Sequence, residues 1–330
     1  MFEELANDRR EATAILEQDK PFAVLPVATV LFTGADLLAK AGIPTFGWNI
    51  QNEWTGPPNF FGEVGALCIG GSCPDVTLPW VAAQLHRKRV GVLAYSVAQS
   101  ADCSDGVKSS FQKFPSAKVE FLDKSLAFGV TDFSADVQRM RGASVDLVTT
   151  CMDFNGVLDI AREMHQQGLS AVHFLPKGYD HDFMASNGTL FEGSIVATEV
   201  APVETNPQFP ALKTYVSWMN KGHYKLAENA EVGWVNADQF VTGLREAGPN
   251  FTQESLIAAI NRETAFDAGG LVGPLDWTRA HTLKQLPPCV AYLRIHNAQF
   301  VPEFAPRGKP FTCFLTPTTD VASAKPTFAQ

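Results

Sequence analysis

The sequence predicts an α/β protein built from two doubly wound lobes, and three observations lead to this fold class. The first is size, because 330 residues with 45% hydrophobic content are enough for two cores of ordinary size. The second is a recurring unit in which an amphipathic stretch, a short apolar run and a polar or glycine-containing turn follow one another, as in parallel sheets covered by helices. The third is that this pattern is interrupted twice, as expected where a chain crosses between lobes.

The first lobe is predicted to begin with a helix and two strands. Asp8 is a plausible N-cap with Glu11 three positions on, and apolar residues follow at helical spacing. Strands are expected over 22–26 and 43–49, with a helix through 35–39 between them. We therefore expect two strand ends to present their loops side by side.

The second lobe is predicted after an interruption that contains Pro57-Pro58 and the glycine-rich stretch 62–71. A helix over 77–86 and a strand over 89–95 open it, and a strand over 194–198 leads into the return crossing, followed by helices over 209–221 and 232–246. The elements between are helices 107–114, 131–140 and 156–167 and strands 119–121, 145–150 and 172–175.

The end of the chain is predicted to be a hairpin of strands 289–295 and 299–301, followed by a mobile tail rich in Pro, Thr, Ala and Ser. The resulting division assigns 1–66 and 200–286 to the first lobe and 67–199 and 287–315 to the second. Residues 316–330 form the tail.

Charge and hydropathy exclude two classes of partner. The net charge is -9, and no basic stripe suited to phosphates is present, so nucleic acid is not expected as a partner. No run approaches the roughly 20 apolar residues that span a bilayer. The opening residues 1–5 also lack the basic and apolar regions of an export signal.

Six cysteines leave both disulfides and buried thiols open. They form no CxxC pair, and no histidine is spaced to complete a zinc site, so no metal is expected. A Cys289–Cys313 bridge would close a loop of about 25 residues and contribute about 3 kcal/mol. Cys103 and Cys151 fall at two strand ends expected to be adjacent, and Cys68 and Cys73 are close enough in sequence for a short loop.

No constellation of catalytic residues is recognised. The sequence has no nucleophile elbow, no phosphate-binding glycine loop, no zinc-protease helix motif and no dinucleotide fingerprint after a strand. The seven histidines are scattered, and Asp180-His181-Asp182, the one local acid and histidine cluster, is interpreted as a solvated turn. We therefore expect neither an enzyme nor a cofactor.

Several segments, taken together, resemble the leucine/isoleucine/valine-type solute-binding proteins of the periplasmic binding protein type I fold. This resemblance implies a binder that captures a small ligand, such as an amino acid or analogue, in an interlobe cleft outside the cytoplasm for ABC permease subunits. A sensory ligand-binding domain of the same fold is the alternative. The segments are 8–12, 41–44, 129–134, 161–168, 236–240, 256–260 and 273–277.

The same resemblance implies that part of the family's first lobe does not precede Asp8 in this sequence. Family members open with an export signal and a strand, a helix and a second strand before the matching position. The first lobe is thus expected to lack that opening, to leave neighbouring strand edges unpaired and to be the less stable lobe.

The family also implies which loops contact the ligand, since ligands gather beyond the carboxyl ends of strands in open α/β sheets. In the first lobe, Thr29 matches a carboxylate-binding hydroxyl at a helix N-terminus, with plain N-capping as the alternative. The first-lobe loop after it contributes Gly47, Trp48 and Asn49. The second lobe contributes Gln99, Asp102, Cys103, Asp153, Phe154 and Tyr179.

The predicted second-lobe loops depart from the amino-acid-binding pattern at one point. Family members that bind aliphatic amino acids place an acidic residue for the ligand ammonium where this sequence has Gly178 or Tyr179. Asp180 lies nearby, and Asp153 is the candidate replacement, although an exposed loop carboxylate is the commoner explanation for any single Asp. The ligand therefore stays open between amino acids and related small polar molecules.

Overall fold

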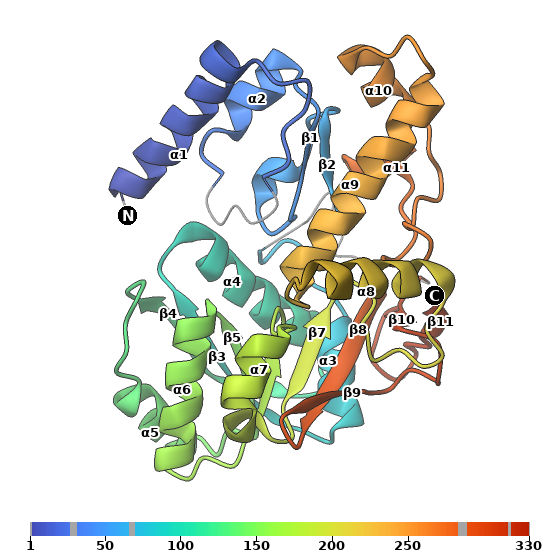
Figure 1. Ribbon diagram of the computed structural model, residues 1–330. Coiled ribbons are helices and arrows are strands. Elements are labelled where there is room, and N and C mark those ends of the chain that lie inside the picture. The colour runs from blue at the N-terminus through green and yellow to red at the C-terminus, as the bar shows by residue number, and fades with distance from the viewer. Residues whose placement is uncertain (1, 27–31, 66–69, 283–288, 316–317, 330) are drawn as a thin grey trace. The chain divides into compact units, whose positions relative to one another are not determined.

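The computed structural model describes residues 2–26, 32–65, 70–282, 289–315 and 318–329. The chain divides into two compact units, one formed by Met1–Cys68 with Phe209–Pro287 and the other by Ile69–Gln208 with Pro288–Gln330. We call them unit 1 and unit 2, and both mix helices and strands, which confirms the predicted α/β class (Figure 1). Within the described ranges, no helix combines the length and apolar character needed to cross a bilayer.

Unit 2 is organised around a nine-stranded sheet. The strand order is β11-β10-β8-β7-β6-β5-β3-β4, and β9 pairs with β8 outside this path. Strands β3 to β7 pair in parallel with one another, whereas β8 pairs antiparallel with β7, β9 and β10. The strands are β3 (Arg89–Tyr95), β4 (Lys118–Leu126), β5 (Leu147–Cys151), β6 (Val172–Leu175), β7 (Ile195–Thr198), β8 (Cys289–His296), β9 (Gln299–Pro302), β10 (Phe311–Cys313) and β11 (Thr327–Ala329).

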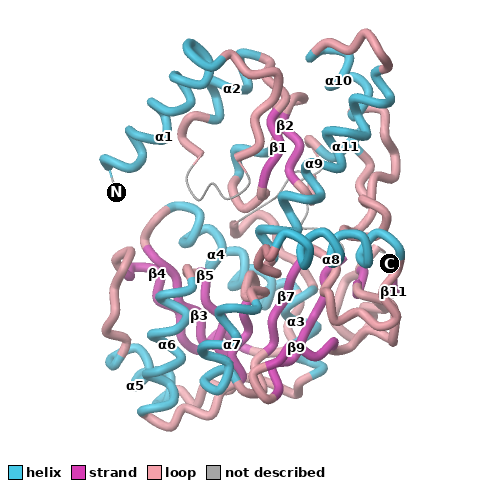
Figure 2. The backbone as a smooth tube through the Cα atoms, viewed as in Figure 1, coloured by secondary structure: helices cyan, strands magenta, loops and turns pink. Residues whose placement is uncertain are grey.

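Helices lie along this sheet (Figure 2), and each of its two faces has its own apolar core. Trp80 and Phe111 bring α3 and α4 onto one face, where they pack with Val92 and Leu147. On the other face, α5 and α6 contribute a second buried cluster that includes Met140 and packs on Leu93 and Val148. The helices are α3 (Thr77–Gln84), α4 (Ala98–Lys113), α5 (Ser134–Gly142), α6 (Phe154–Gln166) and α7 (His181–Asn187), with a 3-10 turn at Gly188–Phe191.

Unit 1 has a much smaller sheet. Strands β1 (Thr45–Gly47) and β2 (Phe60–Gly62) pair in parallel, and a single bridge joins Val24 to Thr45. Its buried aromatic side chains include Trp54, Phe61 and Trp277, and the ring centroids of the last two lie 5.2 Å apart. The helices are α1 (Phe2–Ala14), α2 (Ala35–Ala41), α8 (Pro210–Gly222), α9 (Glu228–Ala247), α10 (Gln253–Ile260) and α11 (Trp277–Ala280), with a π-helical turn at Ile15–Asp19 and a 3-10 turn at Asn52–Trp54.

Two predicted strand and tail assignments differ from the structure. The strand expected over 22–26 is reduced to the Val24 bridge, because only Thr45 on its β1 side pairs with it among the described residues. The tail expected from residue 316 contains β11, which pairs antiparallel with β10. A short strand on a sheet edge gains its hydrogen bonds from a partner far away in sequence, which composition does not reveal.

The start of α4 also differs from the prediction. The helix begins at Ala98 and not at Val107, so the stretch 99–104, expected as a loop, is helical. Gly106 is an interior residue of α4. A Cβ atom there would lie 3.4 Å from the backbone of Gly70, an ordinary contact distance, so α4 packs against this stretch without requiring a glycine.

Candidate functional site

The parallel part of the unit 2 sheet has one point where the chain reverses its direction of winding. From β3 the chain moves through α4 to β4 on one side, whereas β5, β6 and β7 follow one another on the other side. The helices of these two paths pack on opposite faces of the sheet, and the paths divide at the carboxyl ends of β3 and β5. Ligands of open α/β sheets bind at such switch points.

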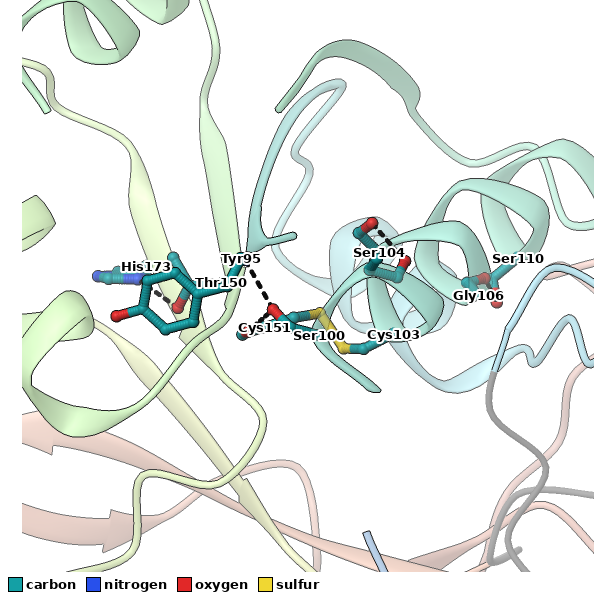
Figure 3. Close-up of a disulfide and its surroundings, with 10 residues drawn as sticks. Tyr95, Ser100, Cys103, Ser104, Gly106, Ser110, Thr150, Cys151 and His173 are labelled. Carbon is teal, nitrogen blue, oxygen red and sulfur yellow. Dashed lines mark hydrogen bonds between the residues drawn. A yellow bond between two sulfur atoms is a disulfide. The ribbon is translucent and has the colours of Figure 1, made fainter. Parts of the chain in front are cut away.

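Hydrogen bonds tie the two strand ends at this point to each other. Tyr95, the last residue of β3, donates its backbone N–H to Ser100 Oγ over 2.7 Å, and Ser100 Oγ donates to the carbonyl oxygen of Cys151 at the end of β5 (Figure 3). The Tyr95 hydroxyl donates to Asp153 Oδ1 at 2.6 Å. Burial, and then this bond to Asp153, raises the pKa of the Tyr95 phenol, so it remains a donor at neutral pH.

Asp153 is the N-cap of α6, as its position before an apolar helical repeat suggests. Its Oδ1 accepts the Gly156 N–H at 3.2 Å, and its Oδ2 accepts from the Asn155 side chain at 3.3 Å. The following helix start is tightly packed, since a Cβ atom on Gly156 would lie 2.2 Å from the Tyr95 hydroxyl oxygen. Asp153 itself is exposed, but its carboxylate already serves three donors.

The other predicted site residues of this region lie on helices and not in open loops. Gln99, Asp102 and Cys103 occupy the first two turns of α4 and are half-buried, which corrects the loop expected there. Asp102 lies on the side of α4 that faces Gly70. Phe154 begins α6, is 37% exposed and packs against the Phe183 ring at a centroid distance of 4.6 Å.

A second aromatic ring is exposed at the same edge of the sheet and was missed in the sequence. Phe128 follows β4, is 51% exposed and lies 5.0 Å from the Tyr95 ring. Tyr95 was also missed, although a signal existed: it ends a predicted strand at the same sheet edge as Asp153. Together these residues give the switch point an aromatic and carboxylate character.

Tyr179 follows β6 and is buried, with 1% of its surface exposed. Its hydroxyl accepts from the Val203 N–H and donates to Glu204 Oε2, both at 2.9 Å, while His181 Nε2 lies 2.7 Å from Glu204 Oε1. Asp180 caps α7 by accepting the Phe183 N–H. The segment 180–182 is therefore a capped helix start tied to the loop after β7, which corrects the solvated turn that was expected.

An ion pair beyond the ends of β6 and β7 was not singled out in the sequence. Lys177 Nζ contacts Glu199 Oε2, and both side chains are largely buried. Burial, with a smaller effect from Glu199, raises the pKa of Asp75, whose carboxylate accepts from the Thr77 hydroxyl and N–H. The Lys177–Glu199 ion pair was missed because the two residues lie 22 positions apart in the sequence and neither belongs to a local motif.

In unit 1 the predicted residues surround the carboxyl ends of β1 and β2. Gly47 leaves space for an aromatic ring, because a Cβ atom there would lie 2.5 Å from Trp54. Asn49 is buried, donating its N–H to Glu63 Oε2 at 2.6 Å and its side chain to the Gly65 carbonyl oxygen. Trp48 between them is half-buried. Thr29 lies outside the described residues.

The structure contains two of the predicted disulfides. Cys103 pairs with Cys151 at a Cα–Cα distance of 6.0 Å, and Cys289 pairs with Cys313 across β8 and β10. These pairings overturn the alternative of reduced, buried thiols for these four residues. Cys68, the predicted partner of Cys73, lies outside the described ranges. Over the part of the chain described, no three His, Cys, Asp or Glu side chains are grouped to hold a metal ion.

Comparison with solved structures supports the same architecture. A branched-chain amino acid ABC transporter protein from Thermus thermophilus with bound valine is 20% identical, with a TM-score of 0.73 and coverage of 91% of this chain and 81% of that one. A solute-binding protein from R. palustris in complex with benzoate is 16% identical, with the same TM-score and coverage. A leucine-binding protein from Thermotoga maritima is 16% identical, with a TM-score of 0.73 over 91% of this chain and 83% of that one.

The sequence itself identifies the family. No curated protein matches it significantly. The family model described as periplasmic binding protein matches residues 6–298, which is most of the chain. Members of this family bind solutes and are not enzymes. The chain therefore belongs to the periplasmic binding protein family and has its type I fold.

Proposed function

We propose that this chain captures an amino acid or a related small polar molecule outside the cytoplasm and delivers it to the permease subunits of an ABC importer. The observation that carries this proposal is the family match over residues 6–298. Similar solved structures named as ABC transporter binding components support it, with valine or benzoate bound. A sensory role of the same fold is the alternative.

We further propose that the ligand contacts the strand-end residues described above. In unit 2, Asp153 and Phe154 are exposed and are assigned direct contact, with Gln99, Asp102 and Cys103 beside them. Tyr179 is buried, and its hydroxyl joins the loop after β6 to Val203 and Glu204 in the loop after β7. In unit 1, Trp48 is assigned contact, with Gly47 and Asn49 holding its loop and Thr29 retained as a carboxylate-binding candidate.

The surroundings of Asp153 bear on the class of ligand. An ammonium group at Asp153 would compete with the Tyr95 hydroxyl and the Gly156 N–H for the carboxylate. Two exposed rings, Phe128 and Phe154, lie at the same sheet edge and suit an apolar or aromatic group. We therefore place small aromatic carboxylates beside amino acids as the second candidate class.

A thermal-shift screen tests both classes. The purified chain is measured with valine, leucine, benzoate and 4-hydroxybenzoate, and a ligand at about 100 times its dissociation constant should add about 2.7 kcal/mol of stability. Phe128→Ala should lower the affinity for an aromatic ligand, whereas Asp153→Asn should lower the affinity for an amino acid. Phe251→Ala, an exposed aromatic change in unit 1, is the control.

The outcomes separate the alternatives. Stabilisation by none of these compounds, nor by other small carboxylates and amides, contradicts the proposed function. A ligand that binds, while the liganded chain leaves the ATPase activity of its ABC importer in vesicles unchanged, favours the sensory alternative. Stimulation of that activity by the liganded chain supports transport.

A further inference from the structure

The Cys103–Cys151 disulfide spans the switch point of the unit 2 sheet. Cys103 lies in the second turn of α4, the helix that follows β3, and Cys151 is the last residue of β5. The bridge (Figure 3) therefore joins the segments that follow β3 and end β5, whose helices α4 and α6 pack on opposite faces of the sheet. No other covalent link is described between these segments.

Hydrogen bonds of Ser100 also connect α4 to the ends of β3 and β5. Ser100, three residues before Cys103 on α4, connects the backbone N–H of Tyr95 to the carbonyl oxygen of Cys151. From the same two strand ends, the Tyr95 hydroxyl reaches Asp153, which caps α6. The disulfide, the Ser100 relay and the Tyr95–Asp153 bond thus close one connected set of constraints around the turn 151–156.

We propose that the Cys103–Cys151 disulfide is a positioning element for ligand binding, because it holds the β5–α6 turn, and with it Asp153 and Phe154, at a set distance from α4. This inference rests on the proposed function for its effect on affinity, but its effect on the turn can be measured without ligand. A preorganised site loses less conformational freedom on binding, so loosening the turn lowers affinity.

Accessibility distinguishes this bridge from the second one. Cys289 and Cys313 are buried, with 2% and 0% exposure, whereas Cys103 and Cys151 are only half-buried. A dithiol reductant can therefore attack the switch-point bridge first, leaving two protein thiols and one oxidised dithiol. The Cys289–Cys313 bridge joins two strands away from the switch point and provides a matched control within the same unit.

The experiment compares Cys103→Ser/Cys151→Ser with Cys289→Ser/Cys313→Ser in the full chain. Hydrogen exchange is measured by NMR at the amides of Tyr95, which donates to Ser100, and Gly156, which donates to Asp153. We expect exchange at these amides to rise on the order of 10-fold in the first variant relative to the second. Affinity for whichever of valine, leucine, benzoate or 4-hydroxybenzoate binds the wild type should fall on the order of 10-fold in the same variant.

Two results would overturn the proposal. Unchanged exchange at Tyr95 and Gly156 in the Cys103→Ser/Cys151→Ser variant would show that the bridge does not hold the turn. Equal affinity in both variants would show that holding the turn has no consequence for binding. If none of the four probes binds the wild type, the proposed ligand classes fail, and the exchange measurement still decides whether the bridge positions the turn. Should the first variant not fold, brief reduction of the folded wild type with dithiothreitol, followed by the same exchange and affinity measurements, provides the same readouts.

Discussion

Units 1 and 2 have the same α/β character but differ in how completely each satisfies its buried polar groups. Unit 2 builds nine strands into one sheet and carries both described disulfides. Unit 1 has two paired strands and one bridge, and its helix α9 buries Asn236 and Gln239 with no hydrogen-bond partner for their amide atoms among the described residues. Because an unsatisfied buried polar group costs about 1–3 kcal/mol, equal hydrophobic patterning need not produce equal stability.

The largest expected effect tests whether crosslinks account for the stability of unit 2. Replacing Cys289 and Cys313 by Ala should lower its free energy of unfolding by about 3 kcal/mol, because the lost bridge closed a loop with a separation of 24 residues. Urea denaturation followed by hydrogen exchange on β8 and β10 measures the change. A loss below about 1 kcal/mol would mean that the sheet and not the crosslink stabilises this edge.

Each unit buries one histidine that is held neutral, so the two histidines should make equal contributions to acid sensitivity, whereas the raised pKa of Glu263 in unit 1, about 7, acts in the opposite direction. Burial lowers the pKa of His173 in unit 2 to about 3 and that of His281 in unit 1 to about 4. The unfolded chain binds protons below about pH 6.5 while the folded chain does not, so this stability is present above that pH and is lost as pH falls.

Each histidine should therefore lower the free energy of unfolding of its unit by about 2 kcal/mol between about pH 7.5 and pH 5. Urea titrations at the two pH values measure this, with His173→Gln and His281→Gln expected to reduce the pH dependence of one unit each. If only one unit loses stability in acid, electrostatics is a second cause of the difference in stability between the units.

Replacing the buried amides of α9 with apolar side chains should reduce the difference in stability between the two units. Asn236→Leu and Gln239→Leu remove groups that have no described partner, so each should stabilise unit 1 by about 1–2 kcal/mol in urea denaturation. Asn220→Leu, at an exposed position on α8, is the control and should have little effect. Destabilisation by either buried replacement would show that the amides have partners in solution.

The smallest effect concerns a helix cap in unit 1. Thr252 and Ser255 form a capping box at the start of α10, in which Thr252 Oγ1 accepts the Ser255 N–H at 3.2 Å. Thr252→Ala should cost about 1 kcal/mol, and Thr252→Ser should restore most of it. If Thr252→Ala and Thr252→Ser are equally stable, the cap does not contribute to the stability of unit 1.

Local signals predicted much of unit 2 from sequence. Strand β6 occupies the predicted residues 172–175, because a short apolar run between turns leaves few alternatives. Asp153 was assigned to the loop before a helix, and the structure makes it the cap of that helix. The Cys103–Cys151 pairing followed from placing both residues at adjacent strand ends.

The features that escaped prediction depend on partners distant in sequence. The 22–26 strand failed to extend because strand formation needs a neighbour, and only Thr45 pairs there among the described residues. The burial of Tyr179 depends on Val203 and Glu204, more than 20 residues away. The direct-contact role of the switch-point residues remains a prediction.

The distribution of indole side chains gives this chain a built-in optical reporter. Of the six tryptophans, Trp48, Trp54, Trp218, Trp234 and Trp277 belong to unit 1, and Trp80 alone belongs to unit 2. Trp54 and Trp277 are fully enclosed, so their emission should shift to longer wavelength when water reaches them. Trp80 is buried as well, so fluorescence would report mainly, but not only, on unit 1, while far-ultraviolet dichroism reports both units. A difference between the two curves would reveal stepwise unfolding.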